Sequence, residues 1–341
     1  MKAYSFPKFD LHLHLDGSLP CMTAWKLAKT RRPELLEQGY EAFRNRMQVH
    51  PNCHSLHEIL DCFDLPLALL QDEEALFFCT KDLIKQLAES GVVYAEIRFA
   101  PQQHIKEGLT QRQVIEAMLS GVRQASKEFP QIEIQLITCM MVFPFDNDAE
   151  NWETVQLCHE YLNHGVCALD IAGPEGVKPF SAYRPFFEKA KHFKIPFTIH
   201  AGENGPVEHI KEALEMGASR IGHGVSAIDD PKLLLRLKEQ RIPLESCVRS
   251  NYVCEVIDNY KHHPIRSYFD QGLLVTVNTD DMTIIDSTLD QEYEILQKEL
   301  HFSDQELLEL CRNSVEAAFL KDDRKQYYLQ LIDTWKNSGD H

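Results

Sequence analysis

Residues 196–203 read PFTIHAGE, a short apolar run that ends in histidine and is followed by alanine, glycine and glutamate. A run of this length and composition, closed by a glycine, is typical of a buried β-strand. The residues that follow, 208–216, are amphipathic with the spacing of a helix. A short strand that leads into a helix is the repeating unit of an α/β fold.

Seven similar runs flank this unit, and helix-like sequence follows them. They lie at residues 9–13, 92–98, 132–141, 166–171, 220–223, 243–246 and 273–278. Because eight apolar strands alternate with helices, we expect a parallel sheet that is buried on both faces. Such a sheet closed on itself is a (β/α)8 TIM barrel, which is the α/β fold that we predict. A doubly wound open sheet is the alternative, and periodicity does not exclude it.

The length of the chain, 341 residues, fits one such barrel with an insertion. The interval between the first two predicted strands, residues 20–90, is long for one connection and has apolar spacing typical of helices. We therefore expect a helical insertion after the first strand, which could cap the mouth of the barrel. The sequence has no internal repeat and no linker rich in Gly, Ser and Pro, so we predict a single domain over residues 1–341.

Composition disfavours several classes of protein. A net charge of −17 argues against nucleic acid or an anionic membrane as the main partner. No apolar run approaches the roughly 20 residues of a spanning helix, and the N-terminal residues lack the apolar region of a secretory signal. The ten cysteines form no CxxC pair. We therefore expect reduced thiols in a cytoplasmic protein.

Histidine and aspartate side chains stand at the ends of four predicted strands. The first strand ends in His12 and His14, which point to the same side because they are two residues apart. Other strands end in His200, His223 and Asp280. The carboxyl ends of barrel strands share one face, so these side chains are expected to converge. Three histidines and a carboxylate, with a position left for water, suit a catalytic zinc ion.

Each of these patterns alone also has an ordinary structural interpretation. Two histidines on a strand can simply be packed, and Glu203 suits the first turn of a helix. One aspartate can cap a helix, which would account for Asp280. The adjacent pair Asp280 and Asp281 fits capping less well, because two carboxylates after an apolar strand require a positive partner. The shared face of the barrel favours a metal site over these separate interpretations.

In this order the motifs resemble those of the adenosine deaminase family. The matching boxes are HLHLDG at residues 12–17, DIAG at 170–173, HAGE at 200–203, GHG at 222–224 and NTDD at 278–281. The similarity spans nearly the whole chain at family-like spacing. It implies a zinc-dependent hydrolase of purine metabolism that converts adenosine or 2'-deoxyadenosine, a small-molecule purine nucleoside, to the inosine product and ammonia.

The resemblance also implies which residues carry the metal and the chemistry. The implied ligands of one zinc ion per chain are His12, His14, His200 and Asp280. Glu203, His223 and Asp280 are the implied catalytic residues. Glu203 would donate a proton to purine N1, and His223 would orient and deprotonate the water that attacks purine C6.

The substrate-binding residues implied by the resemblance are His14, Asp16, Gly173 and Asp281. Asp281 would bond to purine N7, the Gly173 amide to N3, and Asp16 to the ribose hydroxyls. Because a free base has no ribose, Asp16 favours a nucleoside over adenine as the substrate.

Other functions stay open at this point. An adenine deaminase on the same scaffold is the nearest alternative, and a catalytically silent purine-binding barrel is another. Met282 and Arg249 depart from the residues common in the family and leave the exact substrate open. Lys178 and Arg249 are the cations nearest the motifs that could bind a phosphate. The ligand types alone do not separate zinc from iron, cobalt or manganese.

Overall fold

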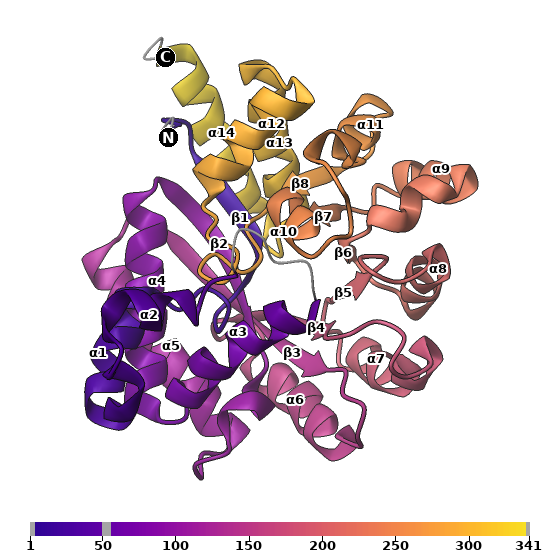
Figure 1. The fold of residues 1–341 in the computed structure, drawn as a ribbon. Coiled ribbons are helices and arrows are strands. Elements are labelled where there is room, and N and C mark those ends of the chain that lie inside the picture. The colour runs from indigo at the N-terminus through magenta and orange to yellow at the C-terminus, as the bar shows by residue number, and fades with distance from the viewer. Residues whose placement is uncertain (1–3, 50–55, 339–341) are drawn as a thin grey trace.

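The computed structural model describes residues 4–49 and 56–338. Within these ranges, parallel strands alternate with helices in the order that the sequence predicts (Figure 1). The strands are β1 (Lys8–His14), β2 (Val92–Phe99), β3 (Glu133–Met141), β4 (Val166–Ala172), β5 (Thr198–Ala201), β6 (Arg220–His223), β7 (Leu244–Ser246) and β8 (Val275–Val277).

The strands form two parallel sheets that meet at two seams. One sheet contains β1 to β4 and the other β5 to β8, each in chain order. Single parallel bridges join Leu169 to Phe197 at one seam and Leu13 to Asp280 at the other. At the second seam the Asp280 amide also donates to the His12 carbonyl at 2.8 Å. An open doubly wound sheet would not bring β8 beside β1, so the predicted (β/α)8 arrangement is confirmed.

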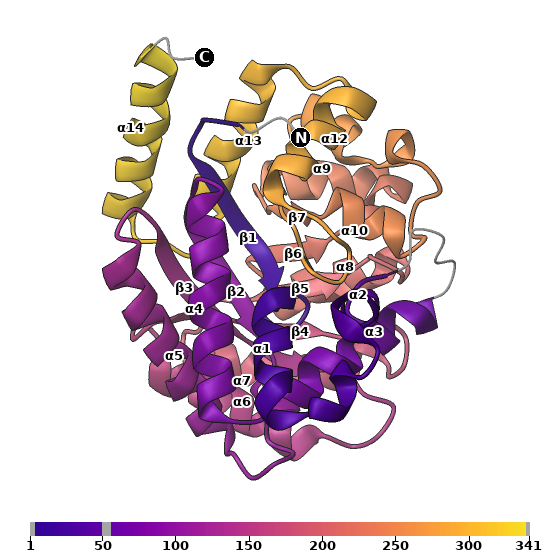
Figure 2. The same cartoon turned by 60° about the vertical axis from the view of Figure 1, so that its left-hand side comes forward.

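Helices form the outer layer around the strands (Figures 1 and 2). α5 illustrates why they form: a capping box of Thr110 and Gln113 satisfies its first amides, and Val114, Ile115 and Met118 are buried at helical spacing. The helices between β2 and β8 are η2 (Pro101–His104), α5 (Gln111–Glu128), α6 (Asp148–Tyr161), η3 (Phe180–Tyr183), α7 (Arg184–His192), α8 (Val207–Met216), η4 (Val225–Asp229), α9 (Pro231–Glu239), α10 (Val248–Val253), η5 (Tyr260–His262) and α11 (Ile265–Asp270).

The connection between β1 and β2 is helical, as predicted. It contains α1 (Cys21–Arg31), η1 (Pro33–Leu36), α2 (Gly39–Asn45), α3 (Leu56–Leu69) and α4 (Glu73–Glu89), while residues 50–55 lie outside the described ranges. α4 lies directly before β2 and packs against α5, so it takes the place of the first barrel helix. The inserted part is therefore α1 to α3, which lie beyond the carboxyl end of β1 (Figure 2).

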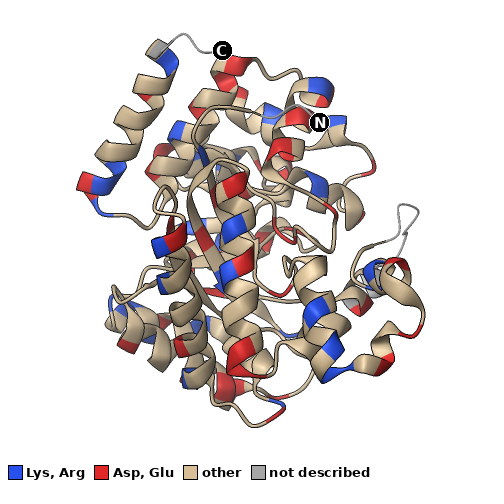
Figure 3. Ribbon diagram, turned by 90° about the vertical axis from the view of Figure 1, so that its left-hand side faces the viewer, with Lys and Arg blue, Asp and Glu red and all other residues tan. Residues whose placement is uncertain are grey.

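Three helices follow β8: α12 (Leu289–Leu300), α13 (Asp304–Ala317) and α14 (Asp322–Ser338). One hydrophobic cluster includes buried residues from Tyr4 to Ile332, and α13 packs on both β8 and β1. Acidic and basic residues are interspersed on the outer helices (Figure 3). None of the described helices is long and apolar enough to cross a membrane. The cysteines of the described residues form no disulfide.

Candidate active site and metal centre

The nitrogen and oxygen donors predicted to hold a metal converge at the carboxyl ends of β1, β5 and β8. His14 Nε2 lies 3.3 Å from His200 Nε2 and 3.5 Å from Asp280 Oδ1. His12 Nε2 lies 3.4 Å from the same aspartate oxygen. In a tetrahedral zinc site with ligands about 2.0–2.1 Å from the ion, neighbouring donors are about 3.3 Å apart. The three distances therefore match the edges of such a tetrahedron, and these residues fit one zinc ion.

Carboxylates support two of these histidines from behind. His12 Nδ1 lies 2.8 Å from Glu245 Oε2, and His200 Nδ1 lies 3.0 Å from Asp170 Oδ2. Both contacts direct Nε2 toward the shared centre. Nε2 of His12 is buried and has no hydrogen-bond partner among the described residues. Such an atom is costly to bury, and a bound metal ion would give it a partner.

Arg98 on β2 joins the two supporting carboxylates. Its Nη1 lies 2.7 Å from Asp170 Oδ2 and its Nη2 lies 2.9 Å from Glu245 Oε2, and all three side chains are fully buried. Arg220 contacts the other Glu245 oxygen at 2.6 Å. Burial alone would raise the pKa of Glu245, but Arg220 and Arg98 hold it well below its usual range. Glu245 thus stays ionised as an acceptor for Nδ1 of His12 in front of it.

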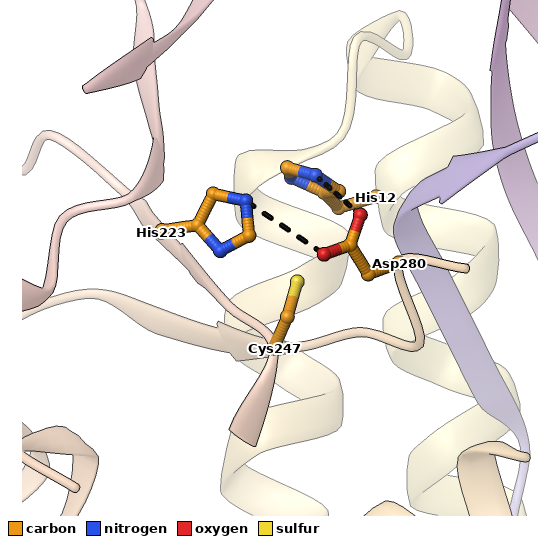
Figure 4. Close-up of side chains that lie close together, drawn as sticks. All are labelled: His12, His223, Cys247 and Asp280. Atoms are coloured by element: carbon orange, nitrogen blue, oxygen red, sulfur yellow. Dashed lines mark ion pairs between the residues drawn. The ribbon is translucent and has the colours of Figure 1, made fainter. Parts of the chain in front are cut away.

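His223 and Asp280 face each other across the site in a rare backbone conformation. Their φ angles are 60° and 64°, in the left-handed region that few non-glycine residues adopt. Figure 4 shows His223 and His12 pointing toward Asp280, with His223 Nε2 3.8 Å from Asp280 Oδ2. That oxygen accepts a hydrogen bond from Ser250 Oγ at 2.7 Å. Cys247 lies in the same cluster (Figure 4).

A chain of hydrogen bonds fixes the His223 ring from behind. Burial lowers the pKa of His263 to about 3, so this ring is neutral. Its Nδ1 accepts a hydrogen bond from the Ile265 amide at 3.1 Å, which places the ring hydrogen on Nε2. Nε2 then donates to Asn251 Oδ1 at 3.0 Å. Asn251 Nδ2 then donates to His223 Nδ1 at 3.1 Å. Burial also lowers the pKa of His223 well below its usual value. The neutral His223 ring therefore carries its hydrogen on Nε2, facing the site.

Glu203 lies in the loop after β5 with its carboxyl group near His223. Its Oε2 is 3.8 Å from His223 Nε2, and 21% of the side chain is exposed. Burial, followed by the negative charge of Asp280, raises the pKa of Glu203 to about 8. The carboxyl group is therefore protonated at neutral pH, as a proton donor must be.

The first and last motifs lie against each other, and this close approach depends on a glycine. A Cβ atom on Gly17 would fall 1.7 Å from Asp281 Oδ1, so a side chain there would displace Asp281. Burial and the neighbouring Asp280 raise the pKa of Asp281 well above its usual value, and burial raises the pKa of Asp16 to about 6. Asp281 Oδ1 has no hydrogen-bond partner among the described residues. When it is protonated, Asp281 can donate a hydrogen bond to a bound molecule.

Comparison with known proteins agrees with this geometry. Residues 7–335 match the family model described as adenosine deaminase. An adenosine deaminase of Haemophilus ducreyi is 39% identical over 328 residues, which cover 95% of this chain and 94% of that protein. The chain belongs to the adenosine deaminase family.

The proteins of known structure that resemble this chain include deaminases named for different purines. An adenine deaminase from Arthrobacter aurescens superposes with a TM-score of 0.88 at 26% identity, covering 97% of this chain and 99% of that one. The N6-methyl-AMP deaminase from Arabidopsis thaliana gives 0.85 at 27% identity, covering 99% and 98%. The fold alone therefore does not choose among a base, a nucleoside and a nucleotide.

Several residues of this adenosine deaminase family member were not predicted as parts of the site. Arg98, Glu245 and Asp170 are charged residues within apolar strands, and that pattern could have revealed them. Residues 250–251 and 263–266 also resemble the family, but that resemblance assigned no role to Ser250, Asn251 or His263. Nothing in the local sequence pointed to Cys247 or Glu175.

The two departures from the family pattern are both engaged within the protein. Arg249 Nε donates to the Ile285 carbonyl at 2.8 Å, and its amide donates to Glu292 at 3.2 Å. Met282 is buried in the main hydrophobic cluster. Gly173 and Lys178 line a small cavity beside His200. The Arg249 side chain is thus engaged within the chain through its Nε atom.

Proposed function

We propose that this chain is an adenosine deaminase that hydrolyses adenosine and 2'-deoxyadenosine to inosine and 2'-deoxyinosine, with release of ammonia. The observation that carries the proposal is one juxtaposition. Donor atoms spaced for a tetrahedral zinc ion lie beside Glu203, a carboxyl group that is protonated at neutral pH. Hydrolysis at a purine amidine carbon requires an activated water on one side and a proton for the ring nitrogen on the other.

The metal site would hold one zinc ion per chain. Its ligands are His12, His14, His200 and Asp280. Zinc, when bound, supplies a Lewis acid that lowers the pKa of water to about 7. Arg98 keeps the carboxylates behind two of the ligands ionised, so both histidines present Nε2 to the ion.

Glu203 and His223 act on the two partners of the reaction. Glu203 donates its proton to purine N1, which withdraws electrons from C6 and opens that carbon to attack. His223 orients the attacking water by donating a hydrogen bond from Nε2. In this tautomer, Nδ1 of His223 is the acceptor, so His223 can accept the proton of that water only after the ring changes tautomer and the Asn251 amide turns over. That turn also breaks the hydrogen bond between His263 Nε2 and Asn251, because both groups would then be donors.

The purine is bound by polar groups around this centre. The neutral Asp281 donates to N7, which is an acceptor, and the Gly173 amide donates to N3. Asp16 accepts from the ribose hydroxyls. His14 is the most exposed of the three histidine ligands, with 15% of its side chain exposed, and also faces the substrate.

A nucleoside substrate is favoured over a base and over a nucleotide. Asp16 is buried and has no evident use when the ligand lacks a ribose. The Arg249 side chain is engaged through Nε by the Ile285 carbonyl, which leaves Lys178 of the two candidate cations for a phosphate. An adenine deaminase, like the Arthrobacter aurescens neighbour, is the second candidate because it needs the same metal and acid.

Ultraviolet absorbance tests the proposal directly. Purified protein is mixed with adenosine, 2'-deoxyadenosine, adenine or AMP, before and after treatment with a chelator. We expect loss of the adenosine and deoxyadenosine bands, abolished by chelation and restored by zinc. Turnover of adenine or AMP alone would refute the substrate assignment, and no turnover by folded, metal-loaded protein would refute the function.

A further inference from the structure

One carboxylate holds the entire loop that carries Glu203. Glu175 Oε1 accepts from the Gly202 amide at 2.8 Å, and Oε2 accepts from the amides of Glu203, Asn204 and Gly205 at 2.9, 3.0 and 2.8 Å. The Glu175 side chain is only 5% exposed. Four successive amides directed at one anion form a concave site of the kind that binds phosphates in other proteins. Here the occupant is a side chain of the same chain.

Two further contacts fix the Glu175 carboxylate itself. His209 Nδ1 lies 3.0 Å from Glu175 Oε1, and the His209 ring stacks on Phe180 with centroids 4.9 Å apart. A Cβ atom on Gly205 would fall 2.5 Å from the same oxygen, so a glycine is needed for this close approach. Glu175 comes from the loop after β4, whereas the four amides that donate to it lie in the loop between β5 and α8. The carboxylate therefore ties two neighbouring loops of the barrel together.

These contacts determine where the Glu203 carboxyl group can lie. Its own amide and the amides on both sides of it are bound to Glu175, so its Cα is held relative to the barrel. The metal ligand of this strand, His200, precedes the bound loop and is held separately by Asp170. A change at Glu175 would thus move the acid without removing a contact to the metal ligands. Positions of reacting groups matter steeply, since a shift of about 1 Å can cost about 100-fold in rate.

We propose that Glu175 is a positioning residue for the reaction, which holds the 202–205 loop so that the Glu203 carboxyl group meets the purine ring. The inference rests on the proposed function, in which Glu203 is the proton donor. It assigns to Glu175 an effect on the chemical step and not on binding of the metal. Glu175 touches neither the metal donors nor, in this assignment, the substrate.

Steady-state kinetics with adenosine on zinc-loaded protein test this inference. Glu175→Gln keeps the size of the side chain but turns an NH2 group toward amides that can only donate. We expect kcat to fall about 10- to 100-fold while KM and zinc content stay close to those of the unmodified protein. Glu175→Asp keeps both oxygens on a shorter side chain and should recover part of kcat. Asp230→Asn is the matched control, because Asp230 accepts from the amides of Lys232 and Leu233 at the start of α9 and should leave kcat unchanged.

The outcomes separate this inference from the function on which it rests. An unchanged kcat in Glu175→Gln, or equal losses in Glu175→Gln and Asp230→Asn, overturns the positioning role. If Glu175→Gln does not fold, Glu175→Asp decides: a reduced kcat with normal KM and zinc supports the inference, and an unchanged kcat overturns it. Glu203→Gln is measured in parallel. If that variant retains full activity, the acid assignment itself fails, whereas an inactive Glu203→Gln beside a normal Glu175→Gln refutes only the role of Glu175.

Discussion

Replacing Arg98 with methionine should weaken both the fold and the metal site. The guanidinium contacts Asp170 at 2.7 Å and Glu245 at 2.9 Å, and it also donates to the Leu11 carbonyl at 2.7 Å. Methionine fills similar space but donates no hydrogen bond. The substitution therefore removes the guanidinium from Asp170 and leaves Glu245 with Arg220 alone, and each carboxylate lies directly behind a predicted zinc ligand.

The expected magnitude follows from this burial. Removing one partner of a buried ion pair costs about 3–5 kcal/mol, and Arg98 serves two carboxylates at once. Against a typical total stability of about 5–15 kcal/mol, this is a large share. Loss of groups that orient metal ligands typically lowers metal affinity about 10- to 100-fold. We expect both effects, because Asp170 and Glu245 would take up protons or move and release the histidines in front of them.

Two measurements on purified protein check the Arg98 prediction. Urea unfolding of the metal-free protein gives the change in free energy of unfolding, and competition with a chromophoric chelator gives the change in zinc affinity. Arg98→Lys keeps the charge but cannot span both carboxylates. Its free energy of unfolding and its zinc affinity should therefore lie between those of the unmodified protein and those of Arg98→Met. Arg241→Met is the control, because Arg241 pairs with Glu316 at the surface, where 57% and 47% of the side chains are exposed. The free energy of unfolding of Arg241→Met should differ from that of the unmodified protein by less than about 1 kcal/mol.

The reasoning would be refuted by a specific result. If Arg98→Met unfolds within about 1 kcal/mol of the unmodified protein and binds zinc with the same affinity, the network under the metal site contributes to neither property. If it loses stability but keeps zinc affinity, the carboxylates do not act through the histidine ligands.

Two further predictions concern buried carboxyl groups. Glu203 must be protonated to donate, and its pKa is raised to about 8. We therefore expect kcat/KM for adenosine to decline as pH rises through that value. A profile that stays flat to high pH, with protein shown to be folded there, would contradict the role of Glu203 as the acid. Glu292 is fully buried, and burial raises its pKa from 4.5 to about 8. Its contribution to the free energy of unfolding is therefore fully present below pH 4.5, the pKa in the unfolded chain, and is lost as pH rises through about 8, the pKa in the folded protein. Glu292→Gln should therefore unfold at higher urea than the unmodified protein at pH 8.5 and show no such gain near pH 4.5, with exposed Glu309→Gln as control; equal effects of Glu292→Gln at both pH values would contradict the prediction.

The fold was accessible from sequence because its evidence is local. Each strand is a short apolar run, and a strand must bury its side chains whatever its neighbours are. The run at residues 196–200 became β5 (Thr198–Ala201), and that at 273–278 became β8 (Val275–Val277), with differences of a few residues at the ends. The long interval between the first two strands was correctly expected to be helical. Periodicity did not show that α4 would serve as a regular barrel helix, since that depends on its packing against α5.

The predicted metal donors came together for a reason that is also visible in sequence. His12 and His14 are two apart on one strand, and parallel strands bring His200 and Asp280 to the same end of the barrel. The sequence also pointed to Glu203 and His223 at that face. It did not reveal the hydrogen on His223 Nε2, because that depends on Asn251, His263 and a backbone amide of a later helix.

The sequence by itself determined the strand and helix order, the resemblance to the family and the predicted metal donors. Only the tertiary structure decided which charges compensate one another and which loops are held. Arg98 and Glu245 are 147 positions apart, and Glu175 binds a loop 27 to 30 positions away. The pattern of one strand or one turn contains no information on which charge will face it from across the barrel. A buried charge is stable only with its partners in place, so those contacts become definite when the strands and loops have assembled.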